Sequence, residues 1–159
     1  MPTLVATWTN AALEIASKAW GGIVPFPVID EFRVGEGGWE LTSAGQVPRT
    51  PDPTLTTLDC VANPGRYPSD SVATFSKALA APQFSWSGNV LSVACTLDFG
   101  EFNDDGFGND PEIYELGLFG PNTLTGMGQI MLAYCTFPVQ VKNVAVTFPN
   151  VVRLAMGRG

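Results

Sequence analysis

The chain has 159 residues, a net charge of −7 and no histidine. Its length suits one domain with its own hydrophobic core, so we expect residues 1–159 to form a single domain. The acidic charge argues against nucleic acid as a ligand, no apolar run approaches the roughly 18 residues of a membrane span, and residues 1–10 lack a secretory signal. We therefore expect synthesis in the cytoplasm.

The proportion of charged residues is low. They make up 14% of the chain, whereas hydrophobic residues make up 45%, and soluble domains average about 25% charged residues. This composition predicts that partner subunits cover part of the surface, as in a homo-oligomer. A compact monomer with Ser, Thr and Asn on its outside would have the same composition.

The first expected element is a helix over residues 10–20. Thr9 or Asn10 can cap its start, and Gly21-Gly22 can end it in the left-handed conformation. Four apolar residues share one face and predict a docking stripe, against either the rest of the chain or a neighbouring subunit: Leu13, Ala16, Ala19 and Trp20.

A strand over residues 28–34 follows, and then a proline-rich stretch. Because proline removes ladder donors, we expect residues 43–71 to form a long irregular excursion that packs on a partner. The helix and the excursion are the predicted contact surfaces, represented by Leu13, Trp20, Pro51 and Pro53.

The clearest local pattern is a hairpin over residues 84–99. Gly88-Asn89 suits a two-residue turn, and the second arm alternates apolar and polar side chains. The odd cysteine count and the absence of CxxC spacing indicate buried thiols, although a bridge between Cys95 and Cys135 remains open.

Further strands are expected over residues 113–119, 130–137 and 144–148, with 151–156 as a continuation or another strand. Short strands separated by Gly, Pro and Asn, after one small helix, predict a mainly β fold. The expected architecture is an antiparallel β-sandwich or open barrel with a short N-terminal helix and a long proline-rich loop.

The sequence offers no catalytic residues. Without histidine, the chain lacks the commonest general base and metal ligand and every Ser-His-Asp or Cys-His arrangement. A glycosidase with two carboxyl groups stays open, but nothing marks an acid in an apolar pocket. We therefore predict a protein that is not an enzyme and needs no cofactor.

One acidic segment has the spacing of a calcium-binding loop. Residues 101–112 place oxygen-bearing side chains at loop positions 1, 3, 5, 9 and 12, with Gly106 at position 6. The candidate ligands are Glu101, Asn103, Asp105, Asn109 and Glu112. The alternative is a solvated acidic loop between two strands, in which Asn, Asp and Gly supply turn conformations.

The four tryptophans could in principle stack on sugars. Their scatter along the chain favours core and interface packing instead, because each aromatic ring buries a large area. A carbohydrate-binding sandwich that recognises a host glycan remains an alternative function.

Three segments resemble the phage tail-collar fibre and baseplate-associated proteins. The run Asp110-Pro-Glu-Ile-Tyr-Glu-Leu-Gly-Leu-Phe-Gly120, followed by Met131-Leu-Ala-Tyr-Cys-Thr-Phe-Pro138, is similar to their "EIGLFD … LLAY-TFP" pattern. The run Ile29-Asp-Glu-Phe-Arg-Val-Gly-Glu-Gly37 is similar to their "I-x-x-F-x-x-G-x-G" strand. The resemblance covers most of the chain outside residues 43–71.

This resemblance implies a structural protein of the virion tail, made in the host cytoplasm and assembled with copies of itself and with other tail or baseplate proteins. Family members often continue into a long fibre, whereas this sequence ends at Gly159, so we expect an adaptor and not a receptor-binding fibre. A capsid decoration or neck protein is the further alternative. The resemblance carries no catalytic residues.

Overall fold

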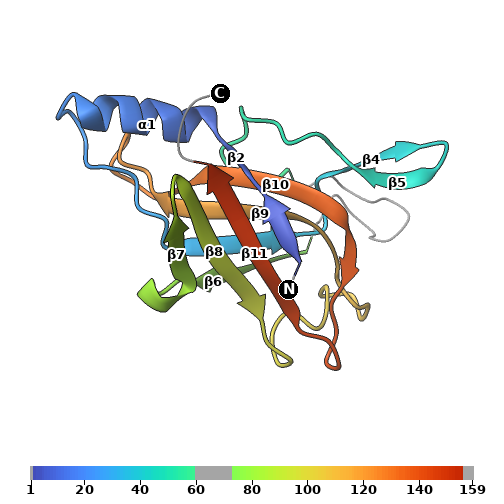
Figure 1. Cartoon of the computed structure of the whole chain (residues 1–159). Helices are drawn as coiled ribbons and strands as arrows, with labels where there is room; N and C mark the ends of the chain where they lie inside the picture. The colour runs from blue at the N-terminus through green and yellow to red at the C-terminus, as the bar shows by residue number, and fades with distance from the viewer. Residues whose placement is uncertain (1, 60–72, 156–159) are drawn as a thin grey trace.

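Two packed sheets form the body of the protein (Figure 1), and the computed structural model describes residues 2–59 and 73–155. The first sheet has the strand order β1-β11-β8-β7, with bounds Thr3–Val5, Phe148–Ala155, Val90–Leu97 and Phe84–Ser87. The second has the order β2-β10-β9-β3-β6, with bounds Thr7–Trp8, Gln129–Val141, Glu112–Pro121, Glu31–Gly35 and Thr74–Ala78. Apart from the parallel pair β1 and β11, neighbouring strands are antiparallel. The predicted antiparallel sandwich is confirmed.

The main core lies between the two sheets. Strand β8 supplies a fully alternating set of buried side chains: Leu91, Val93, Cys95 and Leu97. They meet side chains of the second sheet that include Val34, Leu116 and Leu118. Because burial of each large aliphatic side chain contributes about 1.5–3 kcal/mol, this interface is the largest source of stability in the fold.

The predicted hairpin is confirmed, with β7 and β8 joined by a turn at residues 88 and 89. Gly88 has a φ of 60°, the left-handed conformation that such turns require. The second arm ends at Leu97, so Phe99 lies beyond the strand and is exposed.

The second sheet is covered on both faces. Helix α1 (Asn10–Trp20) packs Ala12 and Ile15 against Ile130 and Leu132 of β10. Next to it, Leu58 packs on Phe119, Met131 and Tyr134. Because side chains on both faces of this sheet are buried, the sequences of β9 and β10 are nearly continuous apolar runs in which apolar and polar residues do not alternate.

Helix α1 has the predicted bounds and caps. The Thr9 hydroxyl accepts a hydrogen bond from the Ala12 amide, and Gly22 is left-handed with a φ of 71°. Of the predicted stripe, Ala19 packs inward but Leu13 and Trp20 are exposed, and the inward face consists of Ala12, Ile15 and Ala19. None of the helices among the described residues has the length and apolarity to cross a membrane.

Three predicted element bounds need correction. Strand β3 begins at Glu31 and not at residue 28, because Pro25 and Pro27 keep the preceding segment out of the ladder. The excursion begins later than expected, since β4 (Trp39–Thr42) and β5 (Gly45–Pro48) form a hairpin that projects from the sandwich (Figure 1). Residues 144–147 form a turn region that leads into β11, which starts at Phe148.

Two further predictions concern the cysteines and the rest of the proline-rich excursion. Cys95 and Cys135 are both buried and free, so no bridge joins them. The short helix η1 (Ala81–Gln83) precedes β7. Residues 60–72 of the predicted excursion, with Cys60, lie outside the described residues.

Candidate functional site

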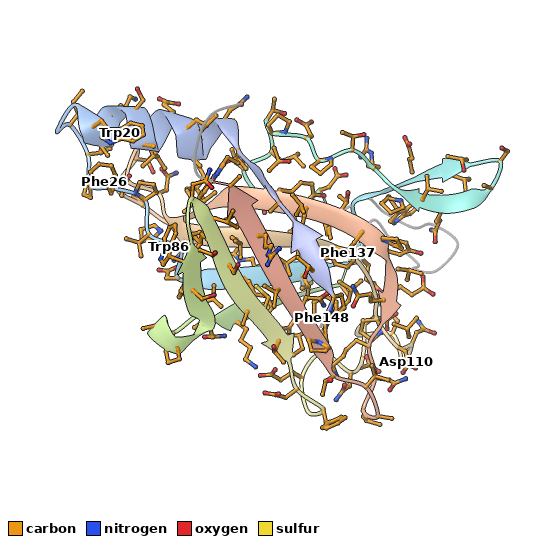
Figure 2. All side chains as sticks on the ribbon, in the orientation of Figure 1. Trp20, Phe26, Trp86, Asp110, Phe137 and Phe148 are labelled. Carbon is orange, nitrogen blue, oxygen red and sulfur yellow. The ribbon has the colours of Figure 1, made fainter. Side chains whose placement is uncertain are left out.

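An apolar surface lies on α1 and the segment that follows it. Its members are exposed large hydrophobic side chains: Leu13, Trp20, Ile23, Phe26 and Val28. We call this set the α1 surface. Trp20 is 80% exposed and Ile23 is 73% exposed, and the rings of Trp20 and Phe26 meet edge to face with centroids 6.2 Å apart (Figure 2).

Local sequence rules explain why these side chains stay outside. Ala12, Ile15 and Ala19 use the inward face of the helix, so Leu13 and Trp20, two turns apart, share a different face. After the helix, the prolines at 25 and 27 prevent a regular ladder, and Phe26 and Val28 remain exposed. The helical pattern predicted Leu13 and Trp20 as surface contacts, whereas Ile23, Phe26 and Val28 were not predicted. Apolar residues interleaved with prolines are the pattern that could have revealed them.

The two predicted proline contacts belong to a different part of the surface. Residues 49–59 lie over the second sheet of their own chain, and the Met131 amide donates to the Thr56 carbonyl at 3.0 Å. The Pro53 carbonyl accepts from the Asn10 amide at 2.7 Å and so anchors the start of α1. Pro53 is exposed and Pro51 is half-buried, so this segment covers its own sheet and presents its prolines outward.

Beneath the same segment is a polar pocket of about 220 Å³, lined by Arg49, Thr50, Asp52, Leu55, Asp59 and Tyr134. The Arg49 guanidinium lies 2.6 Å from the Asp59 carboxylate, whose hydrogen bond raises the pKa of Arg49. Burial, and then the neighbouring Glu115, raises the pKa of the Tyr134 hydroxyl still further above neutral pH, so this hydroxyl is protonated. Hydrogen bonds from Thr54 lower the pKa of Asp52, a second carboxyl group in the pocket. The pocket thus holds a paired cation, a neutral phenol and a carboxylate.

Glu115 is the buried centre of this polar cluster. Its Oε2 accepts hydrogen bonds from the Tyr134 hydroxyl at 2.7 Å and from the Asp59 amide at 2.8 Å. Gly38 leaves room for it, because a side chain there would come within 2.8 Å of the Glu115 Cβ. This cluster was not predicted from the sequence. The signal that marks it is a charged residue in the middle of the apolar run over 113–119.

The candidate calcium ligands are engaged in several different contacts. The Glu101 carboxylate lies 2.6 Å from the Lys77 ammonium, and the Asn103 carbonyl oxygen accepts from the Lys142 ammonium at 2.6 Å. Asp105 is buried and its carboxylate accepts from the backbone amide and the side-chain amide of Asn109. Two of the predicted ligands are therefore bonded to lysines.

Glu112, the fifth candidate, begins β9, and its backbone amide donates to the Glu36 carboxylate at 2.7 Å. Within residues 2–59 and 73–155, no group of three or more His, Cys, Asp or Glu side chains could hold a metal ion. Calcium binding stays a prediction, and a calorimetric titration of the purified protein with calcium chloride tests it.

The tryptophans occupy separate environments. Trp39 is buried, and the Trp8 indole donates to the Ala155 carbonyl at 2.9 Å. Trp86 lies on β7 opposite the inward-facing Leu91. Trp20, on α1, belongs to a different element, so the four rings form no common platform.

Comparison with known proteins identifies no relative: no family model, no curated protein and no solved structure matches this chain.

Proposed function

We propose that this protein is a structural subunit of a phage tail, in the baseplate or the fibre-attachment apparatus, and that it acts as an assembly adaptor through the α1 surface. The observation that carries the proposal is the exposure of Trp20 and Phe26 in contact with each other, beside Ile23. Apolar groups gathered in this way on a folded surface mark sites of protein association. The assignment to a tail rests on the resemblance of residues 29–37, 110–120 and 131–138 to tail-collar and baseplate-associated proteins.

The chemistry of the α1 surface suits a protein partner. Tryptophan is enriched among the residues that dominate binding energy at interfaces, where its ring fills apolar pockets. The helix that carries Trp20 is itself anchored, because Ala12 and Ile15 pack on β10 and the Thr9 hydroxyl donates to the Met131 carbonyl at 2.7 Å. A rigid support lowers the conformational entropy lost on association.

The titratable groups of the polar pocket give little support to a catalytic function. Its arginine and its Asp59 carboxylate neutralise each other, hydrogen bonds from Thr54 lower the pKa of Asp52, and burial and Glu115 raise the pKa of Tyr134. General acid and base catalysis needs groups that exchange protons near the working pH. We therefore propose a role that is not enzymatic.

Light scattering after size-exclusion chromatography tests the assembly proposal. We expect the purified protein to form a homo-oligomer, and Trp20→Ser combined with Phe26→Ser to shift it toward monomer. Trp86→Ser is the matched control, because Trp86 is 62% exposed but lies outside the α1 surface. A monomer at high concentration, together with no binding of tail proteins by the unaltered chain, would count against the proposal.

Two alternatives have distinct readouts. A carbohydrate-binding sandwich would give hits on a glycan array and quenching of tryptophan fluorescence, but the dispersed tryptophans favour it less. A capsid decoration or neck protein would also associate with its neighbours, so only its position in an image of the assembled particle separates it from a tail subunit.

A further inference from the structure

Lys142 is a buried lysine whose polar contacts are neutral. Its side chain is 0% exposed, and its ammonium donates to the Asn103 side-chain oxygen at 2.6 Å and to the Asn143 carbonyl at 3.0 Å. In the part of the chain that the structure describes, no carboxylate lies within ion-pair distance of it, whereas Lys77 pairs with Glu101 and Asp98. A buried ammonium with no carboxylate partner is costly, and this cost favours its neutral form.

The burial of Lys142 also bears on its reactivity. Attack on a carbonyl carbon uses the lone pair of an uncharged amine. Because Lys142 is buried and its polar contacts are neutral, its surroundings disfavour the ammonium form.

Asn103 is presented to this amine by a constrained segment. Phe102, the residue before it, has a φ of 49° and is the one residue other than glycine with a positive φ in the described ranges. Its ring stacks on Phe75 at a centroid distance of 5.6 Å, and this packing holds the unfavourable backbone conformation. Backbone strain of this kind is concentrated at functional sites.

The orientation of the Asn103 amide is also set by its contacts. Its nitrogen donates to the Phe99 carbonyl, so its oxygen, and with it the carbonyl carbon, is turned toward Lys142. Figure 1 shows that the loop after β8 and the loop between β10 and β11 meet at the same end of the sandwich. Thus an amine and a primary amide, 39 positions apart in the sequence, are held in contact.

We propose that Lys142 and Asn103 join in an intramolecular isopeptide bond. The Lys142 nitrogen attacks the Asn103 carbonyl carbon, a new nitrogen–carbon bond forms, and the bond from that carbon to the amide nitrogen breaks. The lysine ammonium first gives up one proton and the attacking nitrogen then loses a second. The departing nitrogen takes up both and leaves as an ammonium ion. Starting from the ammonium and the primary amide, the products are a secondary amide and an ammonium ion, so atoms and charge balance without any co-reactant.

Two physical effects favour this reaction. Holding the amine against the carbonyl replaces an encounter between separate molecules, and such proximity raises the effective concentration by many orders of magnitude. The product also exchanges a buried ammonium for a neutral amide, which removes the desolvation cost. The bond would tie the β8–β9 loop to the β10–β11 loop, and such a cross-link would oppose unfolding of a subunit under mechanical load.

Mass spectrometry tests the proposal directly. The intact folded protein should lack about 17 Da, the mass of one ammonia, relative to its sequence. Residues 78–141 contain no Lys or Arg, so trypsin should release residues 78–142 and 143–153 as separate peptides from a chain without the bond. With the bond, Lys142 resists cleavage, and residues 78–153 should appear as one peptide that lacks the same mass.

Variants separate the isopeptide from other losses of ammonia. Lys142→Met should restore the full mass, and Lys77→Met, the matched control at the same end of the sandwich, should keep the loss. A loss that persists in Lys142→Met would indicate a cyclic imide at Asn103-Asp104 and would overturn the proposal. The full mass in the unaltered protein, after prolonged incubation of the folded chain at pH 8, would overturn it too. Because these masses are independent of association, they distinguish failure of this inference from failure of the adaptor proposal.

Discussion

The hydroxyl of Tyr134 donates a hydrogen bond to Oε2 of Glu115 at 2.7 Å, and both side chains are buried on the outer face of the second sheet beneath residues 49–59. Hydrogen bonds to a charged acceptor in such a place contribute more than neutral ones, because the alternative is a buried carboxylate with one donor fewer. This contact therefore links the covering segment to the sheet.

Tyr134→Phe should destabilise the protein by about 1.5–3 kcal/mol, the usual cost of removing a hydrogen bond to a charged group. Urea unfolding followed by circular dichroism measures the loss. Tyr114→Phe is the matched control, because its hydroxyl donates to the neutral side chain of Gln46 at 2.8 Å. A smaller loss for Tyr134→Phe than for Tyr114→Phe would contradict the argument.

Thr9→Ala should cost about 1–2 kcal/mol, because the hydroxyl caps α1 by accepting from the Ala12 amide and also donates to the Met131 carbonyl. The free energy of unfolding in urea is again the measurement. Thr9→Ser keeps the hydroxyl and should recover most of the stability. Equal losses for the two variants would show that the methyl group, and not the cap, is responsible.

The ion pair of Glu101 with Lys77 should make stability depend on pH. Burial raises the pKa of Glu101, but the hydrogen bonds from Lys77 and the Asp98 amide, with the lysine charge, outweigh burial and lower it overall. A carboxyl whose pKa is lower in the folded state contributes stability above its unfolded pKa, and this contribution is lost as the pH falls through the folded pKa.

Glu101→Gln tests that dependence. At pH 7 we expect a loss of up to about 1 kcal/mol, the range of partly exposed ion pairs. As the pH falls through the folded pKa of Glu101, the difference from the unaltered protein should shrink toward zero. Thermal unfolding at a series of pH values measures it, and a difference independent of pH would refute the assignment.

The thiols of Cys95 and Cys135 should resist alkylation in the folded protein. Burial raises the pKa of both, with a smaller effect of Glu115 on Cys135, whose pKa reaches about 12. Because the thiolate is the reactive form, iodoacetamide at pH 8 should label them about a thousandfold more slowly than an exposed thiol. Labelling is read by mass in a Cys60→Ser background, and fast labelling of the folded chain would contradict it.

Much of the local structure could be predicted from the sequence. The alternation over residues 91–97 defined β8 and its buried face, and the glycines after Trp20 marked the end of α1. These features depend on side-chain period and on backbone conformations that a few residues favour. The β4–β5 hairpin escaped prediction because Pro48 at its end, with Pro51 and Pro53 after it, suggested irregular backbone from residue 43 onward.

Long-range packing decided the rest. The inward face of α1 was predicted only in part, at Ala19, because Leu13 and Trp20 have the same apolar character as Ile15, and only packing against β10 determines which of them is buried. The α1 surface also depends on tertiary structure, because the path of the chain after α1 brings the ring of Phe26 against that of Trp20.

The sequence by itself determined a mainly β chain with one short helix, few charges and no histidine. Composition and the spacing of apolar residues along the chain do not depend on tertiary contacts. Only the tertiary structure decided that Trp20 stays exposed, that Glu115 lies buried beside Tyr134, and that Lys142 touches Asn103. Those contacts join residues far apart in the chain, and their energies depend on how completely the surrounding side chains exclude water.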